Sequence, residues 1–245
     1  MKKIYFLGSF LSLISISTLC AALNGKAPTK APSSLYATAN LPDHCSPGMM
    51  NFFYYINNNM LAGAKAHLEK GINPNACVEN GITPLMRTAY KGYAQLAQLL
   101  VQYKANVNLQ TTSNISFDFG SKISNISKQA TALMLACYSG SVEIVKMLLE
   151  SGAQVNAKDS NGQTALTYVI LGDKNWPHTP LCHNRQLIIK LLLDRGANPH
   201  QEDVYGRTPA DLYFSVAGLK PDFNDTFKQD QALALNDSVY LRMQA

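Results

Sequence analysis

Residues 131–156 read TALMLACYSGSVEIVKMLLESGAQVN, and this stretch predicts a pair of short helices. Thr131 can cap the first helix with its side-chain oxygen, and Gly140 ends that helix because glycine supplies the free backbone geometry of a turn. In the second helix, apolar residues at helical spacing face one way and charged residues face the other. The apolar residues are Val142, Val145, Leu148 and Leu149, and the charged ones are Glu143, Lys146 and Glu150. Gly152 then ends the second helix.

The same pattern recurs along the chain. Its threonine appears at Thr83, Thr131, Thr164 and Thr208. Thr131 and Thr164 are 33 residues apart, whereas the other two intervals are 48 and 44, which are 15 and 11 longer than one unit. A unit of 33 residues with two insertions explains these spacings. One helix pair cannot bury its own apolar face, so neighbouring pairs must stack side by side.

These motifs resemble the ankyrin repeat, whose consensus has Thr-Pro-Leu at the first helix and Leu-Leu-x-x-Gly-Ala-x-Val-Asn after the second. Thr83-Pro84-Leu85 and the run from Leu148 to Asn156 match it. The resemblance implies an all-α solenoid of about five stacked helix pairs with atypical end caps and two loop insertions. The expected repeats are 48–78, 79–109, 129–159, 160–202 and 203–220. The histidine of the consensus is replaced by Met86, Met134, Thr167 and Asp211.

The segments outside the repeats have other compositions. Residues 1–22 have a positive start at Lys2 and Lys3, an apolar stretch and small residues at the end, which predicts a secretory signal peptide. An uncleaved membrane anchor is the alternative. Residues 23–47 are rich in Pro, Ala, Ser and Thr and are expected to form a flexible linker. Residues 221–245 could form a capping tail against the last repeat.

The net charge and the sequence motifs argue against several classes of function. The net charge is +5, and without Lys2 and Lys3 it is near +3, which is too weak a balance to indicate nucleic acid. There is no Gly-rich phosphate loop, nucleophile elbow or His-Glu-x-x-His motif. His178, Cys182 and His183 could bind zinc but lack a fourth ligand nearby, so an ordinary polar loop is favoured and no metal or cofactor is expected. Cys137 is expected to be a small buried core residue.

Two insertions interrupt the repeats. Residues 109–128 enlarge the hairpin loop between the second and third repeats, as either a mobile surface loop or a finger that contacts a partner. Residues 173–183 separate the two helices of the fourth repeat and contain Trp176. That tryptophan either packs back over the solenoid or anchors a partner, since tryptophan is favoured at interface hot spots.

The resemblance also implies where a partner would bind. Ankyrin-like solenoids use a concave side made of hairpin tips and the exposed face of each first helix. On this chain, the variable positions of that side, together with the inserted tryptophan, are Glu79, Asn80, Ile82, Tyr90, Lys91, Tyr138, Ser139, Asn161, Gln163, Trp176, Tyr205 and Arg207. Tyr90, Tyr138 and Tyr205 are predicted to lie on one exposed strip, although any solenoid exposes some tyrosines.

Export would allow disulfides between the remaining cysteines. Gly48 is expected at the turn position that Gly81 occupies one repeat later, which places Cys45 and Cys77 near adjacent hairpins. A bridge needs the two Cα atoms within about 7 Å, so the segment before Gly48 would have to lean across. Two free thiols are the alternative to this predicted disulfide.

The leading hypothesis is that the protein is an exported, monomeric scaffold that binds another protein through its concave face. The protein is not expected to be an enzyme. An ankyrin-like array that follows a secretory signal indicates a protein from a Gram-negative bacterium, located in the periplasm or secreted. Its partner is expected to be a periplasmic protein or a protein of a host. No nucleic acid is expected as a partner, and no membrane once the signal is cleaved. An enzyme or an enzyme-regulatory subunit with a site in the inserted loops is an alternative. An adaptor anchored in the inner membrane is another.

Overall fold

The computed structural model describes residues 47–77, 79–118, 123–172, 183–216 and 242–243. The chain divides into two units, Met1–Leu41 and Pro42–Ala245. All of the described residues belong to the second unit. The predicted signal peptide lies outside the described residues, as do nearly all of the linker and the tail.

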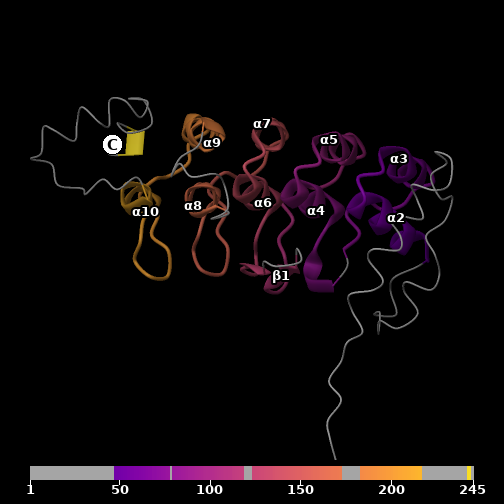
Figure 1. Cartoon of the computed structure of the whole chain (residues 1–245), viewed down its shortest axis with the longest axis horizontal. Coiled ribbons are helices and arrows are strands. Elements are labelled where there is room, and N and C mark those ends of the chain that lie inside the picture. The colour runs from indigo at the N-terminus through magenta and orange to yellow at the C-terminus, as the bar shows by residue number, and fades with distance from the viewer. Residues whose placement is uncertain (1–46, 78, 119–122, 173–182, 217–241, 244–245) are drawn as a thin grey trace, which may run out of the picture. The chain divides into compact units, whose positions relative to one another are not determined.

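The second unit is built from two rows of helices (Figure 1). The inner row consists of α2 (Pro47–Asn57), α4 (Pro84–Lys91), α6 (Ala132–Ser139), α8 (Ala165–Leu171) and α10 (Pro209–Val216). The outer row consists of α3 (Leu61–Glu69), α5 (Ala94–Gln102), α7 (Val142–Glu150) and α9 (His183–Asp194). Each inner helix packs against the next inner helix, and each outer helix against the next outer one. The predicted stack of helix pairs is therefore confirmed, with four complete pairs and the inner helix of a fifth in the described residues.

Local sequence sets the ends of the inner helices, as predicted. The side-chain oxygen of Thr83 accepts a hydrogen bond from the backbone N–H of Met86 at 3.2 Å, and Thr131 does the same for Met134 at 3.3 Å. Each cap satisfies a backbone donor that the first turn of a helix leaves without a partner. At the other end, Gly140 has φ 72°, a left-handed conformation that costs glycine little. The chain then turns back into the outer helix.

The core lies between the two rows and runs from α2 to α10. The largest side chains excluded from water include Phe52, Leu96, Leu133, Ile144 and Tyr213. Cys137 is 1% exposed, as predicted for a small core residue. Burial raises the pKa of its thiol, so the reactive thiolate is disfavoured.

Asparagines in the turns that follow the outer helices connect successive repeats. Asn75 Oδ1 accepts a hydrogen bond from the backbone N–H of Asn106 at 2.6 Å, and Asn156 Oδ1 accepts one from Asn198 at 2.9 Å. Asn108 makes two such bonds, accepting from the N–H of Gln154 and donating to the carbonyl of Gly152. These bonds satisfy backbone N–H and C=O groups in the turns, which have no partner within a helix. They also fix the spacing between neighbouring repeats.

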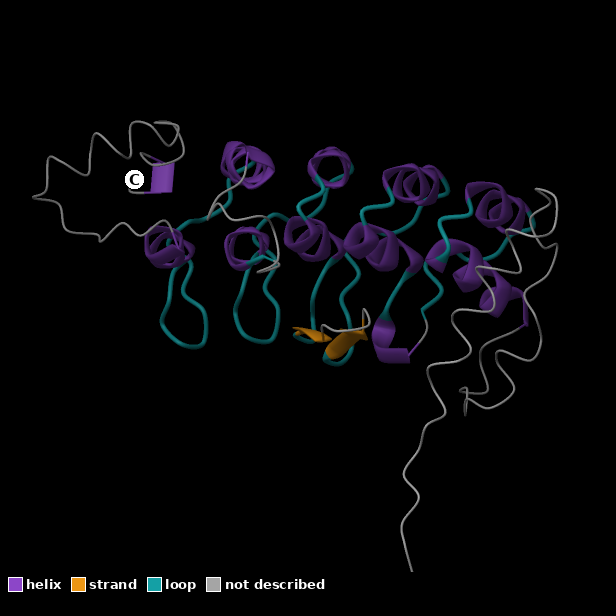
Figure 2. Cartoon of the chain, viewed as in Figure 1, coloured by secondary structure: helices purple, strands orange, loops and turns teal. Residues whose placement is uncertain are grey.

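The first insertion contains a β-hairpin and is therefore not a simple loop (Figure 2). Strands β1 (Ile115–Asp118) and β2 (Ile123–Ile126) pair antiparallel, with Ile115 opposite Ile126. Both isoleucines are only 2% exposed, so the base of the hairpin is anchored in the core. The insertion thus adds two strands to an otherwise helical stack. The second insertion separates α8 from α9 as predicted, and residues 173–182 lie outside the described part of the chain.

One alignment made from the sequence is wrong. Gly48 lies inside α2 and does not occupy a hairpin turn. Helix α2 begins at Pro47 and includes the apolar run from Phe52 to Ile56, so Gly48 is not a hairpin glycine that matches Gly81. The spacing argument for a bridge between Cys45 and Cys77 loses that support. Cys45 lies outside the described residues, Cys77 is a free, exposed thiol in the structure, and the pairing stays a prediction.

Candidate protein-binding surface

Two of the predicted contact residues meet on the inner row. Tyr90 is in the last turn of α4 and Tyr138 in the last turn of α6. Their rings stack with centroids 5.8 Å apart and planes 11° from parallel. Both side chains are half-buried, packed against the core on one side and accessible on the other. The pair forms a flat aromatic surface across two repeats, of the kind that contributes strongly at protein interfaces.

The predicted contact residue Ser139, next to Tyr138, has a structural role. Its hydroxyl donates a hydrogen bond to the carbonyl of Ala89 at 2.9 Å, which joins α6 to α4. The same oxygen lies 3.1 Å from the hydroxyl oxygen of Ser141. These contacts hold the two inner helices at a fixed separation and so position the two stacked tyrosines.

Arg87 and Lys91 lie beside Tyr90 on α4. Residues 87, 90 and 91 are three and four positions apart, so their side chains share one face of the helix. Burial lowers the pKa of the Arg87 guanidinium, although the nearby Tyr90 acts in the opposite direction. Burial, and then the positive charge of Arg87, lower the pKa of the Lys91 ammonium. The two cations are thus close together and partly removed from water.

The hairpins before α8 and α10 are each organised by a buried aspartate. Asp159 Oδ1 accepts hydrogen bonds from the backbone N–H groups of Asn161 and Gln163, at 2.9 and 2.8 Å. Asp203 Oδ1 likewise accepts from Tyr205 and Arg207, at 2.8 and 3.0 Å. Sequence reasoning missed these aspartates. Their signal was available, because each lies five residues before the threonine that precedes the helix and three before a turn glycine.

Neighbouring hairpins also bond to one another through the backbone. The N–H of Thr112 donates to the carbonyl of Asn80 at 3.0 Å, and the N–H of Val204 donates to the carbonyl of Asn161 at 2.9 Å. Asn80 is exposed, and its Oδ1 accepts from the Ser113 hydroxyl at 2.5 Å. The half-buried Asn161 donates from Nδ2 to the Ser127 hydroxyl at 2.7 Å. Both predicted contact residues therefore support the hairpin row as well as lining it, and Gln163 beside Asn161 is half-buried too.

The last hairpin presents two exposed residues of the predicted set, Tyr205 and Arg207. Tyr205 is 67% exposed, and the guanidinium carbon of Arg207 lies 4.8 Å from the centre of its ring. The same guanidinium binds Asp203 Oδ2 from Nε and Nη2, at 3.0 and 2.8 Å. Tyr205 lies in the hairpin before α10, whereas Tyr90 and Tyr138 lie in α4 and α6. The structure therefore brings Tyr90 and Tyr138 together but places Tyr205 at a separate point.

One predicted contact residue is misplaced. Ile82 is only 5% exposed and belongs to the core, so it cannot present its side chain to a partner. It directly precedes Thr83, the residue that caps α4. The side chain of Glu79 and all of Trp176 lie outside the described residues, so their predicted contacts stay predictions.

Comparison with known proteins matches these features to a family. The model for ankyrin repeats in three copies matches residues 52–159 and 115–203. The chain belongs to the ankyrin-repeat family. Ankyrin repeats generally mediate interactions between proteins, and the family is typically non-enzymatic.

Several relatives share these repeats at moderate identity. The ankyrin repeat and SAM domain-containing protein 6 of Rattus norvegicus is 34% identical over 144 residues, 58% of this chain and 14% of that protein. A putative ankyrin repeat-containing protein of Treponema pallidum is 37% identical over 95 residues, covering 39% of this chain and 26% of that one. The putative ankyrin repeat protein YahD of Escherichia coli is 28% identical over 173 residues, 60% of this chain and 80% of its own. The chain thus spans only a small part of the first two relatives.

Other predicted features of this ankyrin-repeat protein fall partly outside the described residues. His178 and Cys182 do so, and His183 is an exposed residue at the start of α9. Within the described ranges, no three histidine, cysteine or acidic side chains are grouped closely enough to bind a metal ion. Nor does any helix there have the length and apolar character needed to span a membrane.

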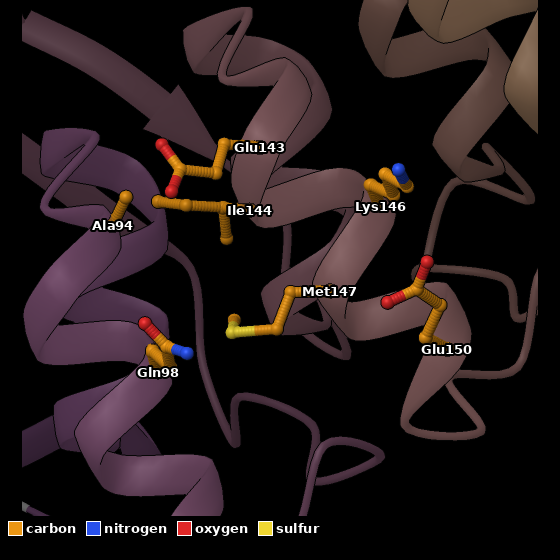
Figure 3. Close-up of a pocket in the computed structure, with 7 residues that line it drawn as sticks. All are labelled: Ala94, Gln98, Glu143, Ile144, Lys146, Met147 and Glu150. Atoms are coloured by element: carbon orange, nitrogen blue, oxygen red, sulfur yellow. The ribbon is translucent and has the colours of Figure 1, made fainter.

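The outer row of this ankyrin stack has a groove of different character. It lies between α5 and α7, encloses about 260 Å³, and is lined by Ala94, Gln98, Glu143, Ile144, Lys146, Met147 and Glu150 (Figure 3). Two carboxylates and one ammonium border it. The outer groove is therefore acidic on balance, in contrast to the inner face of α4.

Proposed function

We propose that the protein is an exported ankyrin-repeat scaffold that binds another protein through the inner helices and the hairpin row. The observation that best supports this function is the half-buried stack of Tyr90 and Tyr138, which spans two repeats. An aromatic pair that keeps one side accessible offers contact area at low cost in side-chain entropy. The partner is a protein of the periplasm or of a host, and the scaffold acts as a monomer.

Export rests on the sequence of residues 1–22, with its positive start, apolar stretch and small residues at the end. Mass spectrometry of the mature N-terminus tests it directly. A chain that begins at Leu23 supports the exported scaffold. A chain that retains Met1–Ala22 in the membrane fraction contradicts cleavage and favours an anchored adaptor.

Site-specific photo-crosslinking tests the binding surface. A photoreactive amino acid replaces Tyr138 in the full chain, and a matched variant carries it at the exposed Lys146 of the outer row. Crosslinks to a second protein at position 138 but not at position 146 are expected. The same adducts from both positions would contradict binding through the inner face.

A further inference from the structure

Charge is distributed unevenly over the inner helices. The four successive helices α2, α4, α6 and α8 contain only two charged residues between them, Arg87 and Lys91. Both are cationic, both belong to α4, and they are four residues apart on one helix face. The inner row is otherwise neutral along these four repeats, so its positive potential is concentrated at one place.

The surroundings of these cations strengthen their attraction for an anion. Arg87 and Lys91 are both partly buried and lie close enough to influence each other's charge. Partial burial removes water that would otherwise screen them, and two like charges at short range repel. A carboxylate near both side chains would be attracted by both positive charges. The lowered pKa of Lys91 is consistent with this environment.

The aromatic stack completes the surface. Tyr90 lies between the two cations in sequence, and its ring stacks on Tyr138 of the next repeat. Arg87 is near enough to Tyr90 to interact with it electrostatically. The phenol rings supply flat apolar area, and their hydroxyls can donate hydrogen bonds to oxygen. We define these four residues, Arg87, Tyr90, Lys91 and Tyr138, as the cationic–aromatic cluster.

We propose that the cationic–aromatic cluster binds an acidic segment of the partner protein, whose Asp or Glu carboxylates lie against Arg87 and Lys91. This inference rests on the proposed scaffold function and names the chemistry of its partner. Guanidinium and ammonium groups form strong, charge-assisted hydrogen bonds with carboxylates. The outer groove, with Glu143 and Glu150, has the opposite balance of charge and would repel the same segment.

Other anions fit the cluster less well. Nucleic acid carries a charge about every 1.7 Å of duplex and is usually bound through many cations along a groove, whereas helices α2, α4, α6 and α8 contain two. Anionic membranes are usually bound by clusters of about 4–8 basic residues. Two cations beside an aromatic pair match a short stretch of polypeptide with one or two carboxylates.

A binding measurement with defined probes tests the proposal. The mature chain is titrated into a fluorescein-labelled octapeptide of alternating Asp and Glu, and into its Asn–Gln counterpart, with fluorescence anisotropy as the readout. The acidic peptide is expected to bind at least about tenfold more tightly than the neutral one, and to weaken as salt rises. The double variant R87Q/K91Q should lose most of this preference, while K146Q on the outer row should keep it.

Several results would overturn the proposal. These are equal affinity for the two peptides, an unchanged preference in R87Q/K91Q, or a tighter, cluster-dependent affinity for phosphatidylglycerol vesicles or single-stranded DNA. If thermal melting shows that R87Q/K91Q is unfolded, K91E serves instead, since Lys91 is the residue at the end of α4. It must reduce acidic-peptide binding by at least as much as K91Q. If the photoreactive residue at position 138 crosslinks a partner while the acidic peptide does not bind, the proposed scaffold function is retained. Only the proposal that the partner's segment is acidic is then wrong.

Discussion

The hydroxyl of Tyr168 donates a hydrogen bond to Oδ2 of Asp159, with the two oxygens 2.9 Å apart. Tyr168 lies on α8, whereas Asp159 belongs to the hairpin that precedes this helix. The aspartate is 4% exposed and its other oxygen holds the hairpin backbone. Burial, and then the charge of Asp159, raise the pKa of the Tyr168 hydroxyl, which therefore keeps its proton and remains a donor. The bond connects the shape of the binding hairpin to the stability of the helix behind it.

Replacing Tyr168 with phenylalanine should therefore destabilise the protein. The change removes one hydrogen bond to a buried carboxylate and leaves that oxygen poorly solvated, which costs about 1–3 kcal/mol. The free energy of unfolding in urea measures the effect. Y205F is the matched control, because Tyr205 is exposed and should change stability by less than about 0.5 kcal/mol. Equal stability of Y168F and the parent would show that the hydrogen bond contributes nothing.

The last hairpin should make the stability of the protein depend on pH in the acidic range. Burial of Asp203 alone would raise its pKa, but hydrogen bonds from Arg207 and from the backbone outweigh it, so the pKa falls below 3.8. A carboxylate with a lowered pKa in the folded protein contributes stability above the unfolded pKa. That contribution is lost as the pH falls from about 4 through the folded value.

Urea midpoints at pH 7, 4 and 2.5 test this dependence. D203N cannot titrate at this position and should lose less stability between pH 7 and 2.5 than the parent does. Its stability at pH 7 should be lower, because the neutral amide binds Arg207 more weakly. Parallel losses in parent and variant would assign the acid sensitivity to other carboxylates, such as Asp211, whose pKa is also lowered, chiefly by the Thr208 hydroxyl.

The contribution of the asparagine hydrogen bonds between repeats to stability should be measurable at Asn108. N108A removes the acceptor for the Gln154 N–H at 2.8 Å and the donor to the Gly152 carbonyl at 3.1 Å. Because the site is only partly buried, water replaces some of these bonds, and a loss of about 1–2 kcal/mol is expected. Q154A keeps the backbone N–H that Asn108 binds and provides the control. The idea fails if the two variants unfold at the same urea concentration.

Local features of the fold could be predicted from the sequence, and longer-range features could not. The caps at Thr83 and Thr131 depend on residues three positions away, so composition and spacing are enough to identify them. The stack of Tyr90 on Tyr138 depends on the separation of two helices whose sequences are 48 residues apart, and the insertion between them conceals their relation. The sequence therefore predicted each tyrosine at the surface, but not their contact with each other.

The mistakes have equally specific causes. Ile82 was placed on the surface because its position in the repeat is variable in the family, although an isoleucine directly before a cap can turn inward to the core. Residues 109–128 appeared to be a polar loop because the two anchoring residues, Ile115 and Ile126, are isolated among polar neighbours. Their pairing across the hairpin is visible only in three dimensions. Asp159 and Asp203 were missed because aspartates in turns are common and their burial is a tertiary property.

The aromatic pair should carry much of the energy of partner binding. Truncating Tyr138 to alanine removes half of the stack and exposes Tyr90, which should cost about 1–2 kcal/mol of binding free energy if the pair is a hot spot. Calorimetry with the partner captured at position 138 measures the change. Y205A, at a separate point of the hairpin row, is the comparison. Unchanged affinity in both Y90A and Y138A would exclude this part of the inner face from the interface.

The C-terminal residues should stabilise the last repeat. Met243 is fully buried and belongs to the hydrophobic core, and the neighbouring Arg242 forms an ion pair with Asp194 at the end of α9. Replacing Met243 with alanine removes buried apolar area and leaves a cavity, which typically costs about 2–5 kcal/mol. R242A should cost less than about 1 kcal/mol, because both partners of the ion pair are substantially exposed. Urea unfolding followed by circular dichroism compares the two variants.

An end repeat has only one neighbour, so M243A should loosen α9 and α10 first, and hydrogen exchange should increase there before it does in α4 or α6. Uniform exchange across the stack, or equal stability of M243A and R242A, would mean that these residues do not cap the repeats.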